Sequence, residues 1–334
     1  MRKIKRLKNG KLPHFLLSEL LKKFKRESAF LGPAIGEDAA IVLFKDSAFI
    51  FTLDPITFTD KEIGHYLLNV NANDIAVSGG IPKYLIFSLL FPKGTEEKQV
   101  RNLFSEIQKE SEKMKVEILG GHTEITNQVN RTVAIGMLIG TAKKDRITPT
   151  RNAKPGDKIL LTKKIAIEGT ATIFREKEKN LRGIFSQEII KRGKNFLIDP
   201  GISILKEAQI LNQNCKVNAM HDPTEGGIAT ALWEISQAAG VKILVEKEKI
   251  PIMKETSLVC DYYHLDPFYL LASGCLLATL SEKEAKKAVK ILKQNRILAT
   301  IIGEAKKGKG AWFRQKNKLR KIVPQVDEIT KIIK

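Results

Sequence analysis

The chain of 334 residues carries 57 Lys and Arg against 37 Asp and Glu, and 43% of its residues are hydrophobic. That length predicts two packed domains, and the composition excludes a largely disordered chain. The longest apolar runs, residues 39–44 and 84–91, fall far short of the roughly 18 residues that span a bilayer. Residues 1–6 are basic, but no apolar segment follows them, so we expect a cytoplasmic protein without a membrane contact.

The positive charge is concentrated at the two ends. Residues 1–26 carry ten Lys and Arg with one acid, residues 305–334 carry ten with two acids, and the body between is nearly neutral. A nucleic-acid enzyme usually spreads basic residues over a working face, and no RNA-recognition, zinc-finger or basic-zipper pattern is present. We therefore expect no nucleic-acid function, and the basic ends favour at most an acidic protein partner.

The first half of the chain alternates segments typical of helices and of strands. Residues 79–82, with two glycines and a proline, end one helix, and the glycine pair at 120–121 is expected to stop a strand. The spacing predicts helices over residues 15–24, 63–78 and 96–114, and strands over 39–44, 48–53, 84–91, 116–119 and 132–141.

The second half begins after the polar stretch 149–156, where we place a boundary between domains 1–150 and 151–334. The sequence predicts strands at 158–162, 241–245 and 299–302, with helices from 201, through Trp233 and from 282. This mixed pattern indicates an α/β or α+β fold of two domains.

The first candidate site lies in a predicted hairpin that turns at Asp46. Residues whose numbers sum to about 92 then face each other, which makes Asp38 and Asp54 cross-strand neighbours. Facing carboxylates repel each other and usually require a shared proton or a bound cation. A slip of one residue would bring Glu37 into the pair in place of Asp38, and two solvated acids at strand ends are the plain alternative.

The second candidate is the pair Asn71 and Asp74, which are three residues apart on one helix face. Asn and Asp are poor helix formers, so something other than helix stability is expected to keep them there. An exposed polar face is the alternative, and the apolar residues 75–77 weaken it.

Two glycine pairs mark further candidates. Gly120 and Gly121 precede His122 and Thr123, and such a pair lets the backbone approach a phosphate, although a simple hairpin turn is the better explanation of this pattern taken alone. The segment 221–227 combines His221, Asp222, Gly226 and Gly227 before a helix. Free N–H groups there would suit an anion and Asp222 its metal, with a plain helix N-cap as the alternative.

The segment 303–309 matches the phosphate-loop spacing G-x-x-x-x-G-K, but Gly310 stands where that loop needs Ser or Thr for Mg²⁺. No helical pattern follows it. We expect a basic turn here.

Taken together, these stretches resemble the superfamily of aminoimidazole ribonucleotide synthetase, thiamine-monophosphate kinase, selenophosphate synthetase and the dehydratase of nickel-iron hydrogenase maturation. The resemblance rests on the order and spacing of residues 36–40, 71–75 and 120–123. Residues 221–232 and 265–270 are most similar to the hydrogenase-maturation branch.

The resemblance implies an N-terminal domain that binds ATP and Mg²⁺ and joins its strands to those of a partner in a dimeric β-barrel. It also implies a C-terminal α/β domain packed against it. The metal-binding acids implied are Asp38, Asp54, Asp74, Asp222 and Glu37, and the implied nucleotide contacts are Gly36, Asn71, Gly120, Gly121, Thr123, Gly226 and Gly227.

We therefore expect a homodimeric enzyme that uses ATP and Mg²⁺ to transfer the γ-phosphoryl group to an oxygen of a small-molecule acceptor. His122 is the candidate for proton transfer or substrate contact, and Lys11 is the candidate for reaching a phosphate from the N-terminal arm. The alternative is a nucleotide-binding maturation or regulatory factor with low turnover, which docks an acidic partner through its basic ends.

Two departures from the relatives shape this expectation. Residues 330–334 lack the C-terminal cysteine on which the hydrogenase-maturation enzyme carries its substrate, which argues against that dehydration. Residues 9–13 keep a lysine but lack the cysteine of selenophosphate synthetase, which argues against selenium chemistry.

Overall fold

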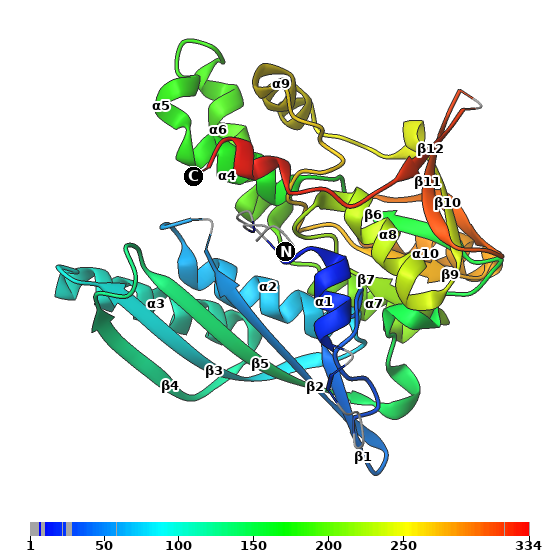
Figure 1. Ribbon diagram of the computed structural model, residues 1–334, viewed down its shortest axis with the longest axis horizontal. Helices are drawn as coiled ribbons and strands as arrows, with labels where there is room; N and C mark the ends of the chain where they lie inside the picture. Colours follow the sequence, from blue (N-terminus) through cyan, green and yellow to red (C-terminus); the bar gives the residue numbers. More distant parts are fainter. Residues whose placement is uncertain are drawn as a thin grey trace, which may run out of the picture.

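The computed structural model describes residues 7, 11–21, 23–24, 29–57, 59–316 and 318–333. The described chain forms two sheets, one from each half of the sequence, with helices packed on both (Figure 1). Residues 1–6 and residues 9–10 of the expected N-terminal arm lie outside the described residues.

The first half builds a five-stranded sheet, sheet A, in which only the β3–β4 pair is parallel. Its strand order is β1 (Ala40–Phe44), β2 (Ser47–Ile56), β5 (Val133–Lys143), β3 (Ile81–Pro92) and β4 (Glu117–Thr126).

Burial alternates along the strands of sheet A because successive side chains point to opposite faces. In β2, Ala48, Ile50 and Thr52 are buried. Helices α2 (Ile63–Val77) and α3 (Glu97–Met114) lie together on one face of this sheet (Figure 1). The inward residues form one apolar core with α2, so β2 and α2 are held at a fixed separation.

The second half builds a seven-stranded mixed sheet, sheet B. Its strand order is β12 (Lys318–Ile322), β11 (Gly310–Gln315), β8 (Lys242–Glu246), β10 (Ala299–Lys306), β6 (Lys158–Thr162), β9 (Leu277–Leu280) and β7 (Val217–His221).

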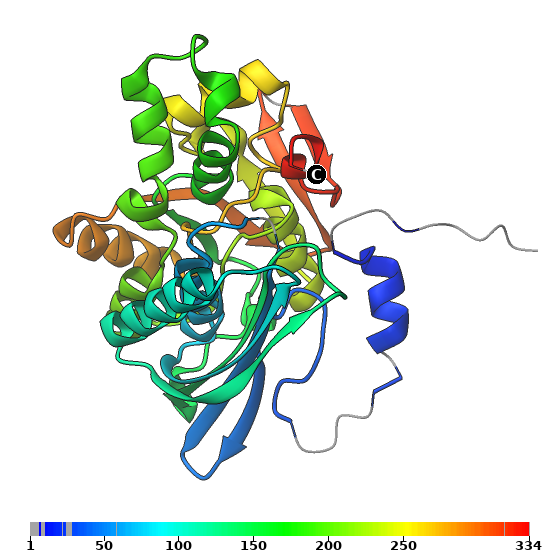
Figure 2. The same ribbon diagram turned by 90° about the vertical axis from the view of Figure 1, so that its left-hand side faces the viewer.

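The remaining α-helices are α1 at the N-terminus and seven in the second half. Their bounds are α1 (His14–Leu21), α4 (Ile167–Glu176), α5 (Glu178–Leu181), α6 (Gln187–Asn195), α7 (Leu205–Asn214), α8 (Gly227–Ala239), α9 (Lys254–Tyr263) and α10 (Glu282–Gln294). Figure 2 shows α1 at the side of the molecule.

Helix α2 lies between sheet A and the second half, where it contacts α7 and β7. Two of its asparagines face opposite ways. Asn73 bonds the backbone of Ile202 and Ile204 in the second half, whereas Asn71 turns toward β2. These bonds tie the two halves together across α2, which places the end of β7 near the end of β2.

The predicted hairpin register was wrong by one residue. Ala40 pairs with Phe51 and Phe44 with Ser47, so the numbers of facing residues sum to 91 rather than 92. The turn contains Lys45, whose φ of 55° is left-handed, and it is tighter than a turn centred on Asp46. Residues 37 and 38 precede the ladder, so neither is a cross-strand neighbour of Asp54.

Two other expectations need correction, and several elements were not predicted. Strand β4 continues through Gly120 and Gly121 to Thr126, because both glycines pair with β3 and a bulge opposite Leu85 and Ile86 takes up only Leu119. Helices α4 to α6 and α9, strands β7 and β9, and the β11–β12 hairpin were not predicted. The phosphate-loop-like segment is mostly strand β10, and only residues 307–309 form the expected turn.

Sheet A of the single chain is an open sheet with β1 and β4 at its edges, and it does not close into a barrel. Within the described residues, no helix has the length and apolar character to cross a membrane.

Candidate functional site

A cavity of about 650 Å³ opens between the two halves of the chain. Its wall combines the loop before β1, the end of β2, α2, the start of α4, the end of β7, and α8. The N-terminal segment from Lys11 to Leu21 also lines it. Acidic side chains from both halves gather in and around this cavity, and each is placed by a different element.

The first group joins β2 to α2. The Asp54 backbone N–H donates to Asn71 Oδ1 at 3.1 Å, and the Asn71 amide donates to the Leu67 carbonyl at 2.9 Å. The Thr52 hydroxyl lies 2.5 Å from Asp74 Oδ2 and 3.3 Å from Asp54 Oδ2. Asn71 therefore fixes the end of β2 and Thr52 holds two carboxylates side by side.

Burial raises the pKa of Asp74 well above its usual value, and the charges of Asp54, Asp222 and Asp38 raise it further. The four aspartates thus act on one another although they come from four separate segments and both halves of the chain. Such a cluster holds protons or a cation, because four ionised buried carboxylates repel one another.

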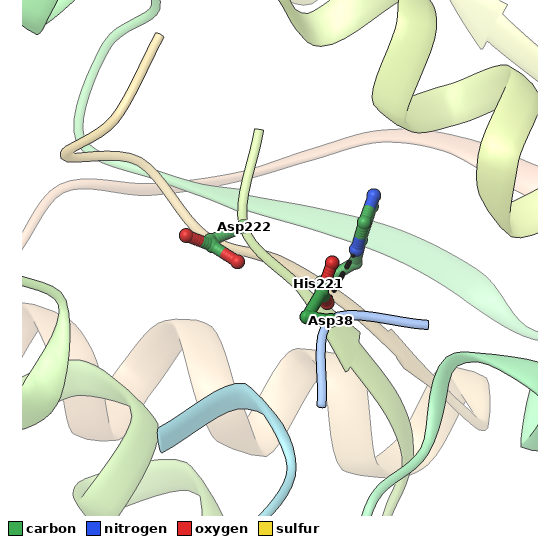
Figure 3. A group of neighbouring side chains, drawn as sticks. All are labelled: Asp38, His221 and Asp222. Atoms are coloured by element: carbon green, nitrogen blue, oxygen red, sulfur yellow. Dashed lines mark hydrogen bonds and ion pairs between the residues drawn. The ribbon is translucent and has the colours of Figure 1, made fainter. Parts of the chain in front are cut away.

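The second group joins Asp38 to the second half through His221. His221 lies at the end of β7, with Nδ1 2.6 Å from Asp38 Oδ2 (Figure 3). Its Nε2 atom lies 3.0 Å from Glu234 Oε2 of α8. Burial lowers the pKa of this imidazole, but the two carboxylates outweigh that effect and raise it well above its usual value. His221 is therefore a buried imidazolium that positions Asp38.

Asp222 follows His221 in the chain, and its carboxylate points away from the imidazole (Figure 3). Only 1% of the residue is exposed, and neither carboxylate oxygen has a hydrogen-bond partner among the described residues. Burial raises its pKa to about 8, with the charges of Asp38 and Asp54 adding to the shift. Oxygen atoms of Asp38 and Asp222 lie within 4.8 Å of each other and of a ring nitrogen of His221. A buried carboxylate without partners is the feature here that points to a missing cation.

Lys11 approaches the same acids from the N-terminal segment. Its backbone N–H donates to Glu225 Oε1 at 2.9 Å, and its ammonium lies 3.5 Å from Thr224 Oγ1. Removal from water lowers the pKa of the Lys11 ammonium. The negative charges of four acids outweigh this effect and raise the pKa above its usual value; they are Glu234, Glu225, Asp54 and Asp38. Lys11 thus supplies one positive charge to a site that has an excess of negative charge.

These shifts predict how the ion-free protein responds to pH. Asp222 has a pKa of about 8 when folded, against about 3.9 in an unfolded chain. Between those values the folded state binds more protons, so its free energy of unfolding falls as the pH rises. Asp74 and His221 act in the same direction, whereas Glu234, whose pKa is lowered from 4.5, opposes them only at lower pH. In EDTA, we expect a lower urea midpoint at pH 8 than at pH 5, and a higher one would contradict the charge cluster.

Glu37, an expected metal ligand, is engaged elsewhere. Its two carboxylate oxygens accept the backbone N–H groups of Thr150 and Arg151, both at 3.0 Å. Burial raises its pKa to about 7, and these two bonds moderate that shift. Glu37 thus fastens the loop before β1 to the start of the second half, which leaves Asp38 as the acid directed at the cluster.

Gly36 lines the cavity and has a structural reason to be glycine. Its φ is +79°, and a Cβ there would lie 2.7 Å from the Glu234 carbonyl oxygen. This close approach brings Asp38 to the position where His221, itself bonded to Glu234, can reach it.

The glycines before α8 do not offer the free N–H groups that the sequence suggested. Gly226 N–H donates to buried Asp327 Oδ2 at 2.6 Å, and Gly227 N–H donates to the Thr224 carbonyl at 3.0 Å. Asp327 comes from the C-terminal segment, about 100 residues away in the sequence, so the expected phosphate position is filled by this chain's own carboxylate.

His122 does not reach the cavity within one chain, and neither do Gly120, Gly121 and Thr123. All four lie in β4, which is separated from β2 by β3 and β5. The His122 side chain is 66% exposed and pairs only with Glu124, at 3.1 Å, among the described residues.

Four residues of the site were not assigned a role from the sequence: Thr52, His221, Glu234 and Glu225. His221 lies in the candidate segment 221–227, and Thr52 lies two residues before Asp54. Both are therefore next to residues that the sequence marked as candidates. Glu234 is one acid on the α8 surface facing the loop before β1, and no local pattern distinguishes it.

Both halves of the chain match domains of one known protein family. The family described as AIR synthase related protein matches with its N-terminal domain over residues 36–142 and with its C-terminal domain over residues 154–312. A thiamine-monophosphate kinase of Pyrococcus horikoshii is 28% identical, covering 91% of this chain and 93% of its own length. A putative hydrogenase expression/formation protein of Methanocaldococcus jannaschii is 27% identical, with 89% of each chain covered.

Solved structures agree on the fold. A hydrogenase maturation protein HypE in complex with ATP superposes with a TM-score of 0.72 at 20% identity, covering 94% of this chain and 91% of that one. A ThiL protein complexed with AMPPCP and TMP gives a TM-score of 0.71 at 20% identity, covering 92% and 95%. Two matched domains in order, over most of the sequence and with this two-domain fold, show that the chain belongs to the AIR synthase-related family.

Proposed function

We propose that this protein is a Mg²⁺-dependent enzyme that transfers the γ-phosphoryl group of ATP to an oxygen of a small molecule. The observation that carries the proposal is the convergence of four aspartates between the halves. Asp38, Asp54 and Asp74 line the cavity, and Asp222, whose two oxygens have no partner among the described residues, lies beside them. The family supports it, because its named relatives include a kinase and a carbamoyl dehydratase.

The residues fit Mg²⁺ by their chemistry. Magnesium prefers carboxylate oxygens, which the four aspartates provide, whereas both nitrogens of His221 are engaged with carboxylates. Bound Mg²⁺ would neutralise the phosphates and the charge that develops during transfer.

The protein's own residues would then act mainly by positioning. Asn71 and Thr52 fix Asp54 and Asp74, and His221 fixes Asp38, so the carboxylates need little rearrangement when a ligand arrives. The Lys11 ammonium is placed to attract a phosphate oxygen of the nucleotide.

Calorimetric titration of ATP with and without Mg²⁺ tests this function. We expect binding that requires Mg²⁺, and ADP formation when a suitable acceptor is present. Thiamine monophosphate and a carbamoylated thiol are the first acceptors to add, because relatives act on thiamine monophosphate or remove water from a carbamoyl group. Equal ATP binding with and without Mg²⁺ would refute the proposed metal site.

A homodimer would explain the position of His122 and the glycines of β4. The face of sheet A that points away from α2 carries exposed apolar side chains, among them Val42, Phe44, Tyr84 and Ile86. Burying such a face against a second copy is favourable, and it would let β4 of the partner approach this chain's cavity. Gly120, Gly121, His122 and Thr123 would then complete the nucleotide site of the other protomer.

Ile86→Glu tests the dimer. Ile86 pairs with Met137 across the outward face, so a buried charge there should halve the mass measured by light scattering. Lys109→Glu, on the exposed side of α3, is the control and should leave the mass unchanged. A wild-type monomer, or a variant that remains dimeric, would contradict this interface.

The alternative function, a regulatory factor docking through its basic ends, can be tested at the N-terminus alone. The C-terminal segment holds Asp327 and so belongs to the structure around α8. Removing residues 1–10 keeps Lys11 and removes five basic side chains. Small-molecule turnover that survives this deletion supports the enzyme, whereas lost turnover with intact ATP binding would favour the alternative.

A further inference from the structure

The cavity holds a second polar group, apart from the four aspartates. Glu168, in the first turn of α4, is only 7% exposed and lines the cavity wall. Its Oε2 atom is buried and has no hydrogen-bond partner in the part of the chain that the structure describes. This oxygen is the only unpartnered buried acid atom among the cavity-lining residues of the described chain, since Asp222 does not itself line the cavity.

The surroundings of Glu168 are polar on one side and negatively charged. Tyr66 and Thr172 also line the cavity, with the Tyr66 hydroxyl 3.3 Å from Thr172 Oγ1, and Ser273 hydrogen-bonds the carboxylate. Burial raises the pKa of Glu168 to about 7, and the charges that raise it further are those of Asp327 and Glu225. The four aspartates are not among the principal charges that act on it.

The basic side chains around this end of the cavity are already paired. Arg175 of α4 forms an ion pair with Glu62, and Lys61 lies near Glu176. Among the described residues, neither forms an ion pair with Glu168. A carboxylate with one unpartnered oxygen, near two other acids, gains most from a positively charged hydrogen-bond donor.

We propose that this end of the cavity binds the phosphoryl acceptor, and that the acceptor carries a protonated nitrogen that donates to Glu168. The proposal rests on the function proposed above and names the chemical class of its substrate. Apolar side chains such as Ile56, Val70 and Leu271 line the same cavity, so the acceptor is expected to pair this cation with an apolar body.

Glu168 would then be a specificity residue rather than part of the nucleotide site. Its single free oxygen suits one N–H donor and not a bidentate pair. An acceptor with an anionic group at this position would be rejected, because three acids already repel negative charge here.

Benzylamine and benzyl alcohol are a matched pair of probes, equal in size but differing in charge. Ligand-observed saturation-transfer NMR at pH 8, where Glu168 is ionised, should detect benzylamine on the nucleotide-free protein and benzyl alcohol at least tenfold more weakly. In Glu168→Gln the difference between the probes should disappear. Glu188→Gln, on the exposed surface of α6, is the control and should keep it.

The outcomes separate this proposal from the proposed function. Mg²⁺-dependent ATP binding in Glu168→Gln should equal that of the wild type. If ATP binding fails in both proteins while benzylamine still depends on Glu168, the cation site stands and the phosphoryl-transfer function falls. Equal binding of the two probes to the wild type would overturn the cationic acceptor even if the variant failed to fold. A weakened Mg²⁺ affinity in Glu168→Gln would overturn it as well, because Glu168 would then serve the metal.

Discussion

Asp222→Asn should strongly weaken Mg²⁺-dependent nucleotide binding and at the same time stabilise the ion-free protein. The two effects have opposite signs because the carboxylate repels its neighbours when no cation is present and binds the cation when one is. The repulsion is evident from the raised pKa of Asp222, about 8, and from its two oxygens, which have no partner among the described residues. The loss of one charged ligand should weaken Mg·ATP binding by about 100-fold, or about 2.7 kcal/mol.

The measurement is thermal unfolding at a pH of about 8.5, where most of the carboxyl is ionised in the folded state. In EDTA the variant should unfold at a higher temperature than the wild type, and added Mg²⁺ with ATP should raise the wild-type midpoint only. Asp261→Asn, exposed on α9, is the control and should behave as the wild type in both conditions. A variant that is less stable than the wild type in EDTA would show that Asp222 has a partner other than a cation.

The fold could be read from the sequence where local patterns are strong. The start of helix α3, at Glu97, was predicted to within one residue. The prediction succeeded because the amphipathic period of α3 is regular and Glu96 and Gln99 form a capping box. Helices α4 to α6 were missed because they are short, with 10, 4 and 9 residues, and because α4 buries Gly169, Thr170 and Thr172, which are poor helix formers. The boundary placed at residue 150 stays a prediction.

The candidate site was predictable in its acids but not in how they are held. Asp38, Asp54, Asp74 and Asp222 stand in short motifs, and the structure brings them together. The hairpin that was expected to pair Asp38 with Asp54 has a different register, and Asp38 instead reaches the cluster through His221. That link depends on a contact between residues 183 positions apart, which no local pattern contains.

His221→Ala should be the most destabilising single change at the site. The imidazolium is bonded to Asp38 and Glu234, and its removal leaves two buried carboxylates facing each other across a void. Breaking a buried ion pair by removing one partner typically costs about 3 to 5 kcal/mol. We expect a loss of this size in the free energy of unfolding in urea at neutral pH.

Glu234→Gln in the His221→Ala background distinguishes charge from packing. If uncompensated charge is the cause, the double variant should be more stable than His221→Ala alone, because one of the two buried charges is gone. If the cavity left by the imidazole is the cause, the second change should add nothing or destabilise further. A cost of less than about 1 kcal/mol for His221→Ala, as for an exposed ion pair, would mean that the imidazole does not bridge the two carboxylates. Asp38 would then be positioned by the Gly36 turn alone, and the coupling between the halves of the chain at this site would rest on Glu37 and its two backbone bonds.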